Sequence, residues 1–205
     1  MFRPFALALL LSTLIACQES RDPRSADGAL RLFGVALEEG DKALIKASLS
    51  EQTNKSLEEI LSTLKEIERE ISLFPTPEAQ TWARTHSLGE DAAKFKDLKS
   101  TDSLWNALVG EKLKWAQTQS SGAVEQGLNM RRVVSGSEEE GEMTVLTRSD
   151  NKVSLRREGT RWVITSFEAP LLGFNKTLNH SLKTMPLNRE EWSRRDQLDL
   201  LLPSP

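Results

Sequence analysis

The spacing of apolar residues changes near Ser120 in this chain of 205 residues, and that change limits the folds it can adopt. Before Ser120 the apolar residues recur at helical spacing, and after it they alternate with polar residues, as in strands with one buried face. Helical spacing returns after Pro170. This order predicts an α+β fold in which N-terminal helices pack on a four-stranded antiparallel meander, followed by one or two C-terminal helices.

Three helices are predicted before residue 75. The first covers 25–39 and ends at Gly40, and Asp41 caps the second. The capping box Ser56-x-x-Glu59 predicts the start of the third, whose apolar residues share one face. Two interpretations of that face are a partner-binding coiled coil and packing on the protein's own core, and its few turns favour the core. Its residues are Leu57, Ile60, Leu61, Leu64, Ile67 and Ile71.

Further helices are predicted before Ser120. Thr76 and Pro77 suit the N-cap and the first residue of one helix, and Asp102 suits the N-cap of another. The stretch 52–117 is therefore predicted to be helical throughout.

Four strands are predicted, over 124–134, 142–149, 152–157 and 161–168. Asp150-Asn151 and Glu158-Gly159 have the chemistry of two-residue hairpin turns. On the second face of the sheet, Arg156 and Arg161 would then lie opposite one another, which predicts an acidic partner nearby or exposure to solvent. The buried face predicted from these turns contains Leu146, Val153, Leu155, Trp162 and Ile164.

The helices and strands of residues 25–185 are predicted to form a single α+β domain. Residues 186–205 follow it as a C-terminal tail that is predicted to be helical. The tail contains Trp192 and several leucines. It is expected either to pack back on the domain or to present an apolar helix to a partner.

An apolar leader ends at the single cysteine of the chain. Arg3 gives the leader its positive charge, and 5–15 is almost entirely apolar. This length suits a secretory signal and falls short of a membrane span. The sequence Leu14-Ile15-Ala16-Cys17 resembles the lipobox of bacterial lipoproteins, which implies that the signal peptide 1–16 is removed and that Cys17 carries the lipid.

Lipidation implies a place in the cell envelope, because two or more acyl chains hold a protein at a membrane where one chain does not. In lipoprotein sorting, an aspartate after the cysteine indicates inner-membrane retention. Gln18 stands there in this chain, which favours the outer membrane. The lipidated tether 17–24 reaches under about 30 Å when extended, so the domain is expected close to the membrane surface.

Composition argues against a nucleic-acid partner and against disulfides. Without the leader the chain has 26 basic and 30 acidic residues, a net charge of −4, and no excess of cations to neutralise phosphates. With Cys17 acylated, no cysteine is left for an internal disulfide. The stability of the domain must therefore come from its core.

The sequence shows no pattern of catalytic or metal-binding residues. Its two histidines, His86 and His180, are far apart, and neither has a Cys or His at ligand spacing, so no metal or other cofactor is expected. Gly-rich phosphate loops and Gly-x-Ser-x-Gly elbows are missing, and tyrosine does not occur. The protein is therefore not expected to be an enzyme.

Two segments resemble the nuclear-transport-factor-2-like fold. The run from Ala29 through Gly40-Asp41 to Leu49-Ser50 is similar to the first two helices of that family, and 153–167 is similar to its closing strands. The resemblance implies a cone-shaped α+β domain of a kind found in secreted lipoproteins of unknown function. The hairpin that the family usually places among its helices is not predicted here, and no catalytic residue of the family can be assigned to this chain.

A sheet packed by helices often encloses an apolar pocket. The predicted function is that of an envelope lipoprotein, anchored to the membrane through Cys17, whose non-enzymatic domain binds a protein or a small apolar ligand. The alternative is a phospholipid carrier, because a helix directly after the last strand resembles the layout of periplasmic Mla-type shuttling proteins. The candidates for lining such a pocket, or for filling a closed core, are Phe33, Trp105, Leu146, Leu155, Trp162 and Ile164.

Labelling of cells with radioactive palmitate tests the lipid anchor. The wild-type chain is expected to incorporate the label, and the Cys17→Ser variant is expected to incorporate none, because the chain has no other thiol. Equal labelling of the two proteins would show that an anchor lies elsewhere.

Overall fold

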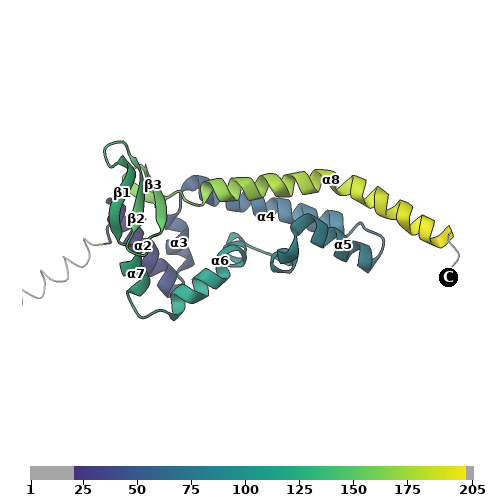
Figure 1. Ribbon diagram of the computed structural model, residues 1–205, viewed down its shortest axis with the longest axis horizontal. Helices are drawn as coiled ribbons and strands as arrows, with labels where there is room; N and C mark the ends of the chain where they lie inside the picture. Colours follow the sequence, from purple (N-terminus) through teal and green to yellow (C-terminus); the bar gives the residue numbers. More distant parts are fainter. Residues whose placement is uncertain (1–20, 202–205) are drawn as a thin grey trace, which may run out of the picture. The chain divides into compact units, whose positions relative to one another are not determined.

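The computed structural model describes residues 21–201, and side chains through residue 194. The predicted α+β fold is confirmed: helices come first, a four-stranded antiparallel sheet follows, and a C-terminal helix ends the described chain (Figure 1). The predicted leader and Cys17 lie outside the described residues. In chain order the elements are α2 (Ala26–Glu39), α3 (Lys42–Ser48), α4 (Glu51–Ile71), α5 (Pro77–Leu88), the 3-10 helix η1 (Glu90–Phe95), α6 (Thr101–Thr118), α7 (Ala123–Leu128), β1 (Met130–Ser137), β2 (Glu142–Thr147), β3 (Lys152–Glu158), β4 (Arg161–Ile164) and α8 (Glu168–Leu201).

The described residues form two compact units. Unit 1 contains the residues up to Asn54 together with Val109–Glu168, and unit 2 contains Lys55–Leu108 and the residues from Ala169 onward. The range 25–185, for which one domain is expected, includes all of the described unit 1 from Ser25 and most of unit 2. Helices α4 and α6 each begin in one unit and end in the other.

Strands β1 to β4 form the sheet of unit 1 in the order of the sequence. One face of the sheet is buried, and α2 packs against β4, α3 and α7. Each fully buried apolar side chain of this kind contributes roughly 1.5–3 kcal/mol to stability. The core side chains of the sheet, all at most 9% exposed, are Met143, Val145, Val153, Leu155, Trp162 and Ile164.

The predicted register of the first hairpin is wrong. Its loop has three residues, 148–150, and is closed by the Thr147 N–H, which donates to the Asn151 carbonyl at 2.9 Å. Asp150 has a φ of 58°, a left-handed conformation that Asp tolerates. The pairing therefore shifts by three residues from the prediction, and an odd shift moves side chains to the other face. Leu146 consequently pairs with Lys152 on the outer face and is only half-buried.

The second hairpin differs from its prediction by two residues. Its loop is Gly159-Thr160, with Glu158 opposite Arg161, instead of Glu158-Gly159. Because an even shift preserves the faces, Leu155 and Ile164 remain on the buried side as predicted.

The predicted strand 124–134 is helical in its first part. Helix α7 occupies this segment, and its first backbone N–H groups are bound by a carboxylate that lies far away in the sequence. Glu38 of α2 accepts from Gly122 at 2.9 Å, from Val124 at 2.6 Å and from Glu125 at 3.2 Å. An acidic side chain at a helix start satisfies otherwise unpaired donors and favours the helix dipole.

Two helix starts are capped as predicted, by Asp41 for α3 and by Thr76 for α5, whose side chains accept a backbone N–H of the first turn at 3.0 and 3.2 Å. Ser25, expected to be the first residue of the first helix, caps α2 in the same way at 3.1 Å. Asp102, predicted as a cap, lies inside α6, where Ser100 accepts the Ser103 N–H at 3.2 Å. Gly40 ends α2 with a φ of 67°. Such caps depend on residues close in sequence, which is why local patterns find them.

Helix α4 begins at Glu51, so its cap lies six residues before the predicted cap, Ser56. Its cap is Ser50, whose Oγ accepts the Thr53 N–H at 3.1 Å. Ser50 is held in place by β4, since its N–H donates to the Ile164 carbonyl at 3.1 Å. The start of α4 is therefore fixed by a contact with the sheet.

A charged cluster on β3 holds the first residues of both long helices. Arg156 lies opposite Val163, whereas the predicted register placed it opposite Arg161. Its Nη2 lies 2.7 Å from Glu168 of α8 and 3.1 Å from Glu158. The second carboxylate oxygen of Glu158 accepts the Glu51 N–H of α4 at 3.2 Å. The hydrogen bond to Glu168, followed by that to Glu158, raises the pKa of Arg156. The cluster ties α4 and α8 to the same strand.

Unit 2 is helical. The predicted apolar face of α4 packs in its core, where all six residues from Leu57 to Ile71 are at most 8% exposed, as the core interpretation predicts. Helix α8 lies beside α4 and runs parallel to it (Figure 1). Asn175 of α8 donates to Glu59 of α4 at 3.2 Å, and further along both helices Arg189 lies 3.4 Å from Glu70. This order of contacts is the one expected for parallel helices.

The C-terminal tail continues α8 without interruption. The helix runs through Pro186, and no element ends at the predicted boundary between 185 and 186. Met185 is 1% exposed, and Arg189 contacts Glu70 of α4. Up to Arg194 the tail therefore packs on unit 2, the first of its two predicted roles.

The Arg156 cluster makes a testable contribution to stability. The Arg156→Met variant keeps much of the aliphatic stem but leaves two carboxylates without their partner, and its side chain is one-third exposed, so solvent screens the charges. We expect the free energy of unfolding, measured in urea, to fall by about 1 kcal/mol. The exposed Arg132→Met on β1 serves as the control and should change it by less than about 0.5 kcal/mol. Equal losses in the two variants would contradict this role.

Candidate functional site

The residues predicted to line a pocket or core are divided between the units. Phe33, Leu155, Trp162 and Ile164 are buried in unit 1, at 0–6% exposed, and Trp105 is 6% exposed in unit 2. Leu146 lies on the outer face of the sheet. Phe33 also contacts Phe167 with ring centroids 6.4 Å apart. The structure therefore gathers four of the six residues in the core of unit 1.

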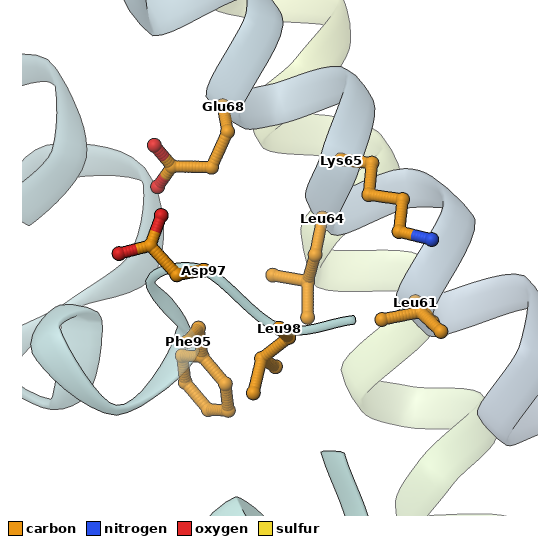
Figure 2. A pocket seen from close by; sticks show the side chains of 7 residues that line it. All are labelled: Leu61, Leu64, Lys65, Glu68, Phe95, Asp97 and Leu98. Atoms are coloured by element: carbon orange, nitrogen blue, oxygen red, sulfur yellow. The ribbon is translucent and has the colours of Figure 1, made fainter. Parts of the chain in front are cut away.

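A small pocket in unit 2 is the candidate binding site (Figure 2). It has a volume of about 180 Å³ and lies between α4 and the segment that follows α5. Leu61 and Leu64 of α4 supply apolar surface, as do Phe95 and Leu98. The polar residues around it are Lys65, Glu68 and Asp97.

Two carboxylates and one amine belong to the charged residues that line this pocket. Figure 2 shows the carboxylates of Glu68 and Asp97 pointing toward one another, with the Lys65 amine directed away from them. Arg84 of α5 donates to both oxygens of Glu68, at 3.0 and 2.7 Å. This pair, with a smaller contribution from Asp97, raises the pKa of Arg84 above that of a free guanidinium. The carboxylate of Glu68 is thus paired with Arg84, whereas Asp97 is exposed to solvent.

The backbone at Asp97 is left-handed, with a φ of 62°. Asp and Asn adopt this conformation more readily than other residues with a side chain. The turn lets Phe95 enter the core while Asp97 stands at the pocket mouth, because the chain reverses between them. Nothing in the local sequence pattern of Lys96-Asp97-Leu98 predicts this site.

An aromatic cluster in unit 2 was also missed from the sequence. His86 stacks on Trp82, one helical turn away in α5, with ring centroids 4.9 Å apart and planes within 10°. Trp192 of α8 and Phe74 contact the same indole at 5.4 and 6.4 Å. The spacing of Trp82 and His86, four residues apart, was the available signal. The cluster joins α5 to α8 as a packing contact.

Within residues 21–194, no three His, Cys, Asp or Glu side chains are grouped as metal ligands would be. His86 and His180 are both exposed. A scan of family models and searches of curated proteins and of solved structures gave no match to this chain. Among the described helices, none has the length and apolarity needed to cross a membrane.

The aromatic cluster predicts that replacing Trp192 lowers the free energy of unfolding more than replacing Trp115 does. The Trp192→Ala variant removes a half-buried ring that packs on Trp82, and we expect the free energy of unfolding to fall by about 2 kcal/mol. Trp115 is 59% exposed, and Trp115→Ala should cost less than about 0.5 kcal/mol. Circular dichroism in urea measures both, because it does not depend on the deleted fluorophore. Similar losses would show that α8 is not held by Trp192.

Proposed function

We propose that the protein is a lipoprotein of the bacterial cell envelope, favouring the outer membrane, that is anchored by lipid on Cys17 and binds another protein. The binding role rests on one observation, the pocket of Figure 2, which combines apolar side chains with the exposed carboxylate of Asp97. No catalytic step is proposed, since Glu68 is committed to Arg84.

The size of the pocket favours a side chain as its occupant. Its volume of about 180 Å³ lies below the roughly 300–1,000 Å³ of sites that enclose small molecules. A pocket of this size can take one side chain that projects from the surface of a partner. Anchoring side chains of this kind supply much of the energy of protein interfaces.

The lining indicates which side chain fits. Leu61, Leu64 and Phe95 can contact an aliphatic stem, and Asp97 at the mouth favours a positive charge. Lysine and arginine combine such a stem with such a tip. We therefore propose that a basic side chain of the partner enters this pocket.

The same geometry gives less support to the phospholipid carrier. A carrier must shield acyl chains, and two larger depressions of about 420–430 Å³ on the described surface are wide open and lined by both polar and apolar residues. In unit 1 the apolar face of the sheet is filled by its own core. Protein binding is accordingly the function we prefer.

Cross-linking in cells tests this role. A photoreactive amino acid at Leu98, which is half-buried and borders the pocket, should form a discrete covalent adduct with one protein. The same probe at Lys114, an exposed position on α6, should not form that adduct.

The charge at the pocket mouth supplies the second control. Asp97→Asn removes the charge of an exposed residue and keeps a side chain that tolerates the left-handed backbone, so the fold should persist while the Leu98 adduct falls about tenfold. An adduct that is unaffected by Asp97→Asn, or that contains only phospholipid, would contradict the proposal.

A further inference from the structure

Exposed cations gather at one end of the sheet of unit 1. Arg132 of β1, Leu146 of β2 and Lys152 of β3 form one cross-strand row on the outer face. Arg131 and Arg148 lie at the same end of the strands, and all four cations are exposed. We call these four residues the basic end.

The acidic groups around the basic end are neutralised by partners. Asp150 lies 2.7 Å from Arg131, and Glu125 of α7 lies 2.8 Å from Arg21. Asp27 is paired with Arg31 at 2.8 Å. Arg132, Arg148 and Lys152 therefore contribute three positive charges to a chain whose net charge is −3.

The opposite end of the same strands carries charges of both signs. The loop between β1 and β2 contains Glu138, Glu139 and Glu140, all exposed. Arg157 and Arg161 lie at the same end, and Arg157 donates to the Glu138 carbonyl at 2.9 Å. Since β1 and β2 run antiparallel, this acidic loop lies at the other end of the sheet from the basic end.

The described chain begins beside the basic end. Arg21 contacts Glu125 of α7, and the Met130 N–H at the start of β1 donates to Asp27 at 2.8 Å. The turn between β2 and β3 packs on the same helix, since the Ser149 N–H donates to the Gly127 carbonyl at 3.0 Å. Helix α7 therefore links the entry of the chain to the cationic turn (Figure 1).

The proposed anchor brings this end of unit 1 to the membrane. Cys17 precedes Arg21 by four residues, which span at most about 14 Å when fully extended. A lipidated Cys17 lies at the membrane surface, so Arg21 and its neighbours must lie near it. Cations attract anionic headgroups within about one Debye length, roughly 8–10 Å.

From these contacts we infer that the basic end of unit 1 rests on anionic phospholipid headgroups when the protein is anchored. The inference depends on the proposed lipidation of Cys17. The anchor supplies the affinity, and the basic end sets which side of unit 1 faces the bilayer.

Lysine footprinting tests this orientation on the native acylated protein. The protein is inserted into vesicles of phosphatidylcholine alone or with phosphatidylglycerol, and the rate of lysine acetylation is read by mass spectrometry. We expect Lys152 to react on the order of fivefold more slowly on the anionic vesicles. Lys112 and Lys114, exposed on α6, should react equally on both. Salt at about 1 M should abolish the protection of Lys152, because the Debye length falls to about 3 Å.

Matched variants identify the charges responsible. Arg132→Ser with Arg148→Ser removes two cations of the basic end, and the protection of Lys152 should disappear. Lys42→Ser with Lys112→Ser removes the same charge from exposed positions elsewhere in unit 1 and should leave the protection intact.

Two failures are distinguishable. A protein that does not sediment with either kind of vesicle would contradict the lipid anchor itself. A protein that sediments with both, while Lys152 reacts equally on both, would overturn the orientation and leave the anchor standing. Protection that appears only when an acidic protein is added would assign the basic end to a protein partner and also overturn the inference.

Discussion

Arg156 is the residue on which the placement of the two longest helices depends. Its guanidinium binds Glu168, the first residue of α8, and Glu158, whose carboxylate also accepts the first N–H of α4. The Ser50 N–H adds a backbone hydrogen bond to Ile164 of β4. Removing the cation would leave two carboxylates close together, which costs more than the loss of one exposed ion pair. Strands β3 and β4 thus fix where both helices start.

This dependence explains which parts of the fold could be predicted from the sequence. Caps formed by residues close in sequence, such as Asp41 and Thr76, were predicted correctly, as was the change from helical to alternating spacing. The start of α4 and the helix α7 were missed, because Glu158 and Glu38 act from about one hundred and from more than eighty residues away. The predicted register of the β2–β3 hairpin was wrong because its loop has three residues, with Asp150 in a left-handed conformation, where a two-residue turn was expected.

The candidate site was less accessible to sequence reasoning than the fold. Phe33 and Trp162 were predicted as possible pocket lining because they are large and apolar, but such residues are usually buried in a core, and both are buried here. The pocket of Figure 2 instead uses the margin of an amphipathic helix, Leu61 and Lys65, and a left-handed Asp97 that no periodicity indicates. Pockets of this kind arise where elements meet imperfectly, so they depend on tertiary packing. Lipidation at Cys17 is predicted from four contiguous residues, which lie outside the described part of the chain, and it stays a prediction.

The chemical state of Cys17 decides the central claim, because the membrane location, the short tether and the orientation of unit 1 all follow from it. Mass spectrometry of the N-terminal peptide of the mature protein, purified from cells in detergent, measures that state directly. The account predicts a peptide that begins at Cys17 and carries the mass of a diacylglyceryl group. A peptide that extends into residues 1–16, or one that begins at an unmodified Cys17, would contradict it.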